Sequence, residues 1–121
     1  MKIINAQNRR NESMIEFVVD DVNHHESPRN FYENAMRELL RGTDSDVVID
    51  LYLSNADQRS CTATEIRSAV AELLEKTPMQ DFCPELDEIV SAYAFRADWN
   101  AEEYVWRSGQ QYWLLCWGTS A

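Results

Sequence analysis

A chain of 121 residues, 45% of them hydrophobic and 26% charged, has the length and composition of one globular domain. Its 21 acidic and 11 basic residues give a formal net charge of −10, which argues against binding to nucleic-acid phosphates or to anionic membrane surfaces. Cys61, Cys83 and Cys116 lie far apart without CxxC spacing, so we expect free thiols rather than a disulfide framework or a zinc site. The N-terminus lacks the apolar core of a secretory signal, and the sequence therefore predicts a cytoplasmic protein.

The first 25 residues allow two interpretations. Ile3 and Ile4 predict either a short edge strand or a frayed terminus. Over residues 13–25, Ser13 and Glu16 fit a capping box, and the apolar residues that follow recur at a spacing of three to four, which favours a helix. The run Phe17–Val19 could instead form the centre of a strand.

The next 50 residues predict two helices with a strand between them. Ser27 is a good N-cap for a helix that begins at Pro28 and stops at Gly42. Apolar residues alternate over Asp46–Leu53, which predicts a strand. A second capping box begins at Thr62 and predicts a helix that runs to about residue 76.

The C-terminal third is rich in aromatic residues and predicts a three-stranded meander. The expected strands cover residues 89–97, 102–107 and 111–117, after a loop at 79–88. Gly109 can adopt the positive φ that a tight hairpin turn requires. All four tryptophans lie at positions 99–117, and we expect most of these aromatic rings to fill the core.

Together these elements predict an α+β fold. We expect a two-layer sandwich in which about three helices pack on one face of an antiparallel or mixed sheet that ends in the C-terminal meander. The open face of that sheet must then meet solvent or more protein, so a homodimer through this face is one expectation.

The residues of this chain exclude most catalytic chemistries. Three scattered glycines provide neither a dinucleotide-binding fingerprint nor a phosphate loop. His24 and His25 are adjacent, so their side chains diverge, and we expect two exposed histidines that bind no metal. The sequence therefore predicts no catalytic residue, no cofactor and no metal ligand. A small enzyme that uses a cysteine or a carboxylate pair is the alternative, and its sign would be a deep pocket that contains a group with a strongly shifted pKa.

Acidic residues surround the aromatic hairpin. Between residues 77 and 121 there are seven acids and only two arginines. Acids accelerate encounter with a basic partner, and tryptophan is a common interface anchor. We therefore expect a stoichiometric inhibitor or immunity protein that covers a basic toxin such as a nuclease. The predicted contact residues are Asp81, Glu85, Asp87, Glu88, Asp98, Trp99, Glu102, Glu103 and Trp106.

A nucleic-acid mimic of the anti-restriction or anti-CRISPR type is an alternative, and it would need its carboxylates in phosphate-like rows. For the inhibitor, charge reversal at Asp87-Glu88 or at Glu102-Glu103 is expected to slow binding of the partner without loss of the fold.

Overall fold

The computed structural model describes residues 1–120, and Ala121, the last residue of the predicted single domain, lies outside the described residues. The elements are β1 (Lys2–Asn8), β2 (Ser13–Asp21), the 3-10 helix η1 (Val22–His24), α1 (Pro28–Leu40), α2 (Asp46–Ser54), β3 (Arg59–Ser60), α3 (Ala63–Lys76), β4 (Ile89–Asp98), β5 (Ala101–Ser108) and β6 (Gln111–Thr119). Over residues 1–120 the strands form one six-stranded sheet in the order β1-β2-β6-β5-β4-β3, with antiparallel neighbours. The predicted α+β class and the C-terminal meander are confirmed.

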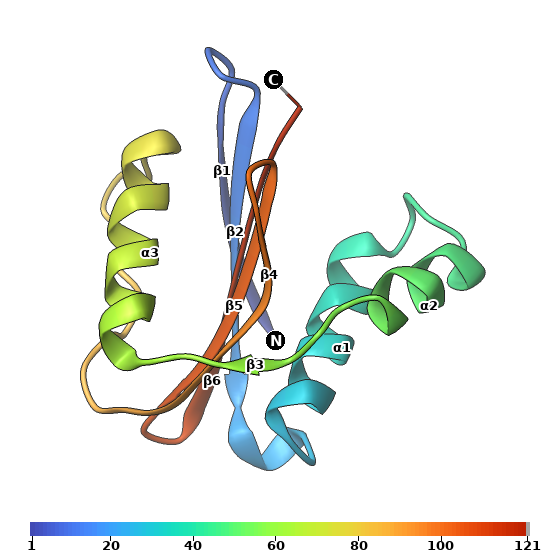
Figure 1. Ribbon diagram of the computed structural model, residues 1–121, viewed down its shortest axis with the longest axis vertical. Helices are drawn as coiled ribbons and strands as arrows, with labels where there is room; N and C mark the ends of the chain where they lie inside the picture. The colour runs from blue at the N-terminus through green and yellow to red at the C-terminus, as the bar shows by residue number, and fades with distance from the viewer. Residues whose placement is uncertain (121) are drawn as a thin grey trace.

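Helices cover both faces of the sheet. The pair α1 and α2 lies on one side and α3 on the other (Figure 1). The core is accordingly divided into two clusters, one around Phe31 and Leu114 under α1 and α2, the other around Ile66 and Leu115 under α3. Central strand β6 has four consecutive buried residues, Tyr112–Leu115, so both of its faces need a helical cover. The layering therefore differs from the expectation of helices on a single face.

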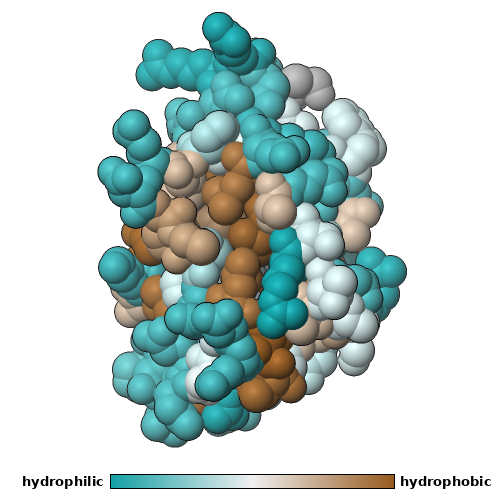
Figure 2. Space-filling view, turned by 90° about the vertical axis from the view of Figure 1, so that its left-hand side faces the viewer, coloured by the Kyte–Doolittle hydropathy of each residue, from teal (hydrophilic) through white to brown (hydrophobic). Residues whose placement is uncertain are grey.

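The α3 side carries much of the aromatic core. Trp106 and Trp113 stack there at 6.1 Å between ring centroids. Figure 2 views this side and shows hydrophobic residues reaching the surface in a central strip bordered by hydrophilic ones. Partly buried residues such as Leu74 and Phe82 pack against the cluster beneath. No helix within residues 1–120 has both the length and the apolar character needed to cross a membrane.

The two capped helices are confirmed. Ser27 Oγ accepts a hydrogen bond from the Asn30 N–H at 3.0 Å, and Pro28 occupies the first turn of α1. At α3 both bonds of the capping box are present, since Thr62 Oγ1 accepts from the Glu65 N–H and the Glu65 carboxylate accepts from the Thr62 N–H. These bonds satisfy N–H groups that a helix start would otherwise leave without partners.

The strand predicted over Asp46–Leu53 is wrong, because this segment forms helix α2. Ser45 caps it, and Ile49 and Leu53 share the buried face four residues apart. Leu51, which alternation would bury beside them, is 63% exposed. In nine residues the apolar pattern fits both periods, and packing against α1 selects the helical one.

The helix preferred for residues 13–25 is also wrong, and the alternative strand is correct. Strand β2 runs between β1 and β6 in the interior of the sheet. Phe17, Val18 and Val19 are all buried because both faces of β2 are covered. A strand of this kind does not alternate between apolar and polar residues in its sequence. Ser13 caps no helix; its hydroxyl hydrogen-bonds the Thr77 hydroxyl at 2.5 Å. Of the two alternatives for Ile3 and Ile4, the edge strand is correct, because both residues lie in β1 at the edge of the sheet.

Candidate functional site

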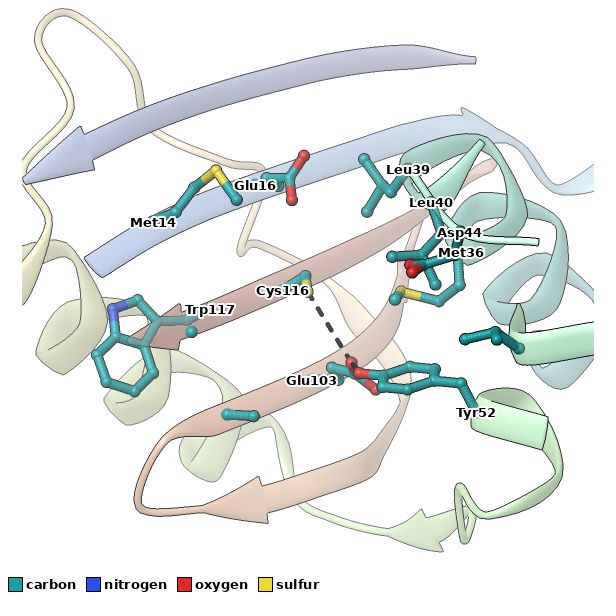
Figure 3. A pocket seen from close by; sticks show the side chains of 13 residues that line it. Met14, Glu16, Met36, Leu39, Leu40, Asp44, Tyr52, Glu103, Cys116 and Trp117 are labelled. Atoms are coloured by element: carbon teal, nitrogen blue, oxygen red, sulfur yellow. Dashed lines mark hydrogen bonds between the residues drawn. The ribbon is translucent and has the colours of Figure 1, made fainter. Parts of the chain in front are cut away.

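An apolar pocket of about 270 Å³ lies between the sheet and the α1–α2 pair. Its walls come from the end of α1, with Met36 and Leu39, and from α2, with Tyr52 (Figure 3). Its floor is the part of the sheet formed by β2, β6 and β5. Cavities for drug-sized ligands start at about 300 Å³, so this one suits a small molecule or a single inserted side chain.

Three chemically active side chains cross the floor of the pocket in one row. Glu16 on β2 is paired with Cys116 on β6, and Cys116 is paired with Glu103 on β5. Residues directly opposite one another on adjacent strands point to the same face, so all three side chains face the pocket (Figure 3). The thiol therefore lies between two carboxylates.

Glu103 is buried, with 1% exposure, and is held by three other side chains. Tyr32 and Tyr52 donate their hydroxyls to its two carboxylate oxygens, the Tyr32 bond measuring 2.5 Å. Arg96 Nε lies 3.2 Å from Glu103 Oε1 in an ion pair that lacks the alignment of a hydrogen bond. Arg96 also donates to the Tyr52 carbonyl at 2.7 Å and stacks over the Tyr52 ring at 3.9 Å. This network fixes α1 and α2 to the sheet.

A bulge in β4 is what brings Arg96 to Glu103. The register shifts between Ala94 and Arg96, so that Phe95 and Arg96 both lie on the α1 side. Regular alternation would have placed Arg96 on the α3 side, because Phe95 stacks against Tyr32 on the α1 side. The extra residue of a bulge re-aims side chains in this way.

The pKa shifts in the pocket describe its chemistry. Burial and then the charge of Glu103 raise the pKa of the Cys116 thiol well above its usual range, so the thiol is protonated at neutral pH. Burial and then Glu103 likewise raise the pKa of the Tyr52 hydroxyl. A protonated thiol is a poor nucleophile, so the raised pKa of Cys116 gives no support to cysteine catalysis.

Glu16 differs from Glu103 in having no partner. Within the described residues its carboxylate makes no hydrogen bond and no ion pair. Burial raises its pKa, with no other contribution. The other carboxylate that lines the pocket, Asp44, is exposed at its mouth.

The residues predicted to contact a partner are divided between the two ends of β5. Glu85, Asp87 and Glu88 lie at the β5–β6 turn, where the Asp87 carbonyl accepts from Ser108 Oγ at 2.5 Å. Asp98 and the 77% exposed Trp99 lie at the β4–β5 turn. The eight residues of β5 separate these turns by roughly 23 Å. The structure thus does not bring the predicted set into one patch.

The remaining predicted residues have separate environments. Asp81 is exposed in the loop before β4, and Glu102 is half-buried and accepts from Tyr104 Oη at 2.7 Å. Glu103 and Trp106 are buried, which corrects their prediction as contact residues. Trp106 instead packs under α3 and donates to the Glu85 carbonyl at 2.9 Å.

The histidines serve a structural purpose. His24 and His25 both contact the Asp20 carboxylate, at 3.0 and 2.7 Å. The His25 side chain is 3% exposed, which corrects the expectation of two exposed histidines. Among residues 1–120 no group of three or more histidine, cysteine or acidic side chains is arranged to hold a metal ion.

Sequence reasoning did not identify the pocket residues Glu16, Tyr52 and Cys116 as a group, nor Arg96 as the counter-ion of Glu103. Comparison of the chain with family models, with curated proteins and with solved structures found no match. The geometry of the pocket and the chemistry of its side chains therefore carry the functional argument.

Proposed function

We propose that this chain is a cytoplasmic stoichiometric binding protein that neutralises a basic protein partner, as an immunity protein neutralises a nuclease toxin. The observation that carries the proposal is the combination of an exposed tryptophan with an acidic, apolar pocket at one end of the sheet. Trp99 lies in the β4–β5 turn, and Ala101 of the same turn region lines the pocket. Among the described residues, the pocket is lined by three carboxylates and by no cationic side chain.

The surface beside the pocket supports the same proposal. Val47, Val48 and Leu51 project from α2 with more than half of each side chain exposed, and Val48 also lines the pocket. Apolar groups beside carboxylates are the composition expected of an interface for a basic protein. Cys61, Cys83 and Cys116 are free thiols, which is consistent with a reducing compartment such as the cytoplasm.

The test is capture of a partner from cells that encode the protein, followed by stopped-flow binding. We expect a basic partner. Asp98→Lys is expected to slow association and to flatten its salt dependence. The sequence led us to expect the same of charge reversal at Asp87, but Asp87 lies at the other end of the sheet, roughly 23 Å away and beyond the Debye length of about 8 Å, so Asp87→Lys is now the matched control. Trp99→Ala is expected to raise the dissociation rate about 30-fold, which corresponds to a hot spot of about 2 kcal/mol.

Three results would contradict the proposal. They are capture of no protein, capture of an acidic protein, and equal effects of the two lysine substitutions on the association rate. The nucleic-acid mimic fits the geometry less well, because the predicted acids are divided between two ends instead of forming a row.

A small enzyme is the second candidate, and the observation in its favour is that Glu16, a carboxyl with a raised pKa, lies in a pocket. Glu103 is engaged by Arg96 and two tyrosines, so Glu16 would act alone as a general acid. Turnover of a small molecule by the purified protein, lost in Glu16→Gln, would support this candidate.

A further inference from the structure

The environment of Glu16 indicates what the pocket is built to receive. Apolar groups from Met14, Met36 and Leu39 line the cavity around the floor that carries this carboxylate (Figure 3). Glu16 is half-buried, and a carboxylate partly removed from water is unfavourable unless an opposite charge or a donor meets it. Glu103 in the same row has such partners, and Glu16 has none within residues 1–120.

The charges that line the pocket select the occupant. Its charged residues are Glu16, Asp44 and Glu103, and the Glu103 charge is already matched by Arg96. An anion would be repelled, and a neutral apolar ligand would bury Glu16 further without a partner. A ligand with an apolar stem and a cationic head would contact the methionine and leucine walls and also pair with Glu16.

We propose that the pocket receives the side chain of a lysine or arginine from the basic protein partner, with Glu16 as its counter-ion. The cavity of about 270 Å³ suits one such side chain better than a cofactor. The aliphatic stem lies along Met36 and Leu39, and the cation stops at Glu16, since Tyr52 is already stacked with Arg96. This inference rests on the proposed function, because it names the group through which the partner is held.

The pocket is tested without any partner by n-butylammonium, n-butylguanidinium and the neutral n-butanol, each titrated by heteronuclear NMR. We expect both cations to bind and to shift the amide signals of Glu16, Cys116 and Met36. Butanol is expected to bind at least about tenfold more weakly, the difference that a charge-assisted hydrogen bond provides. Glu16→Gln is expected to remove this difference, and Asp87→Asn, an exposed acid at the other end of β5, is the control that retains it.

The same variants separate this inference from the proposed function. If the cations bind through Glu16 but no partner is captured, the pocket assignment stands and the proposed function fails. If a basic partner is captured but its dissociation rate is unchanged in Glu16→Gln, the function stands and the inference is overturned. Equal binding of cations and butanol to the wild type, or an unchanged preference in Glu16→Gln, also overturns it.

Discussion

Replacement of the buried carboxylate of Glu103 by alanine tests the network that joins the helices to the sheet. Glu103→Ala leaves the Arg96 guanidinium, whose side chain is 17% exposed, without its counter-ion. It also removes the acceptor of the Tyr32 and Tyr52 hydroxyls. Breaking a buried ion pair from one side costs about 3–5 kcal/mol. Arg96 keeps its bond to the Tyr52 carbonyl, so we expect a loss at the lower end of this range, about 3 kcal/mol in the free energy of unfolding.

The assay is urea unfolding followed by tryptophan fluorescence, in which Trp106 and Trp113 report on the buried α3 side. Glu102→Ala is the matched control, since it removes the same side chain one position earlier, on the opposite face of β5. Glu102 accepts one hydrogen bond, from Tyr104, so its loss should cost about 1 kcal/mol or less. The reasoning is refuted if Glu103→Ala costs less than about 1 kcal/mol or no more than the control. Charge reversal at Glu103, expected from sequence to spare the fold, is now expected to unfold it.

Three further predictions concern a cap, a carboxyl and the thiols. Thr62→Ala should lower the free energy of unfolding by about 1 kcal/mol through loss of the α3 cap, and an unchanged urea midpoint would contradict this. Glu16→Gln should stabilise the protein at neutral pH, because burial raises the folded-state pKa of Glu16 and makes its charged form unfavourable in the folded protein. This gain in the free energy of unfolding should vanish when the pH falls below the unfolded-state pKa of the carboxyl. Urea unfolding at neutral pH and at such a low pH checks both statements. With a disulfide reagent, the exposed Cys83 should react first, because burial raises the pKa of the Cys61 thiol to about 11 and raises the pKa of the Cys116 thiol well above its usual range. A faster reaction at Cys61 or Cys116 would contradict this prediction.

The parts of the fold that sequence predicts well are those decided by neighbouring residues. The N-caps at Ser27 and Thr62 use hydrogen bonds that reach three residues along the chain, and both helices begin where predicted. Gly109 adopts a φ of +58° in the predicted turn between β5 and β6. Such bonds and turns form within a few residues, so no distant contact was needed to foresee them.

The two errors in secondary structure arise where a distant partner decides. Strand β2 is covered on both faces and therefore lacks the alternation of a half-buried strand. The apolar pattern of α2 fits both periods, and its packing against α1 through Ile49 and Leu53 selects the helix. The pocket is harder still to predict. Its row of Glu16, Cys116 and Glu103 depends on the register of three strands.

The predicted acidic patch failed for a geometric reason that the sequence itself contains. An extended strand carries the residues before and after it to opposite ends, so Asp87 and Asp98 cannot meet once β4 is extended. Successive strand residues also face opposite sides, which separates Glu102 from Glu103. Proximity in sequence was therefore a poor guide to proximity on the surface.

The two carboxylates on the pocket floor show how environment assigns different tasks to the same side chain. Glu103 accepts from two hydroxyls and pairs with a guanidinium, and these contacts hold α1 and α2 against β5. Glu16, two strands away in the same row, has an apolar surrounding and no partner among the described residues. The charge of Glu16 does not stabilise the fold, but under our proposal it stabilises a bound cation. In a chain with 21 acids, the acid to test first for function is therefore Glu16, which is half-buried in the pocket and has no partner among the described residues.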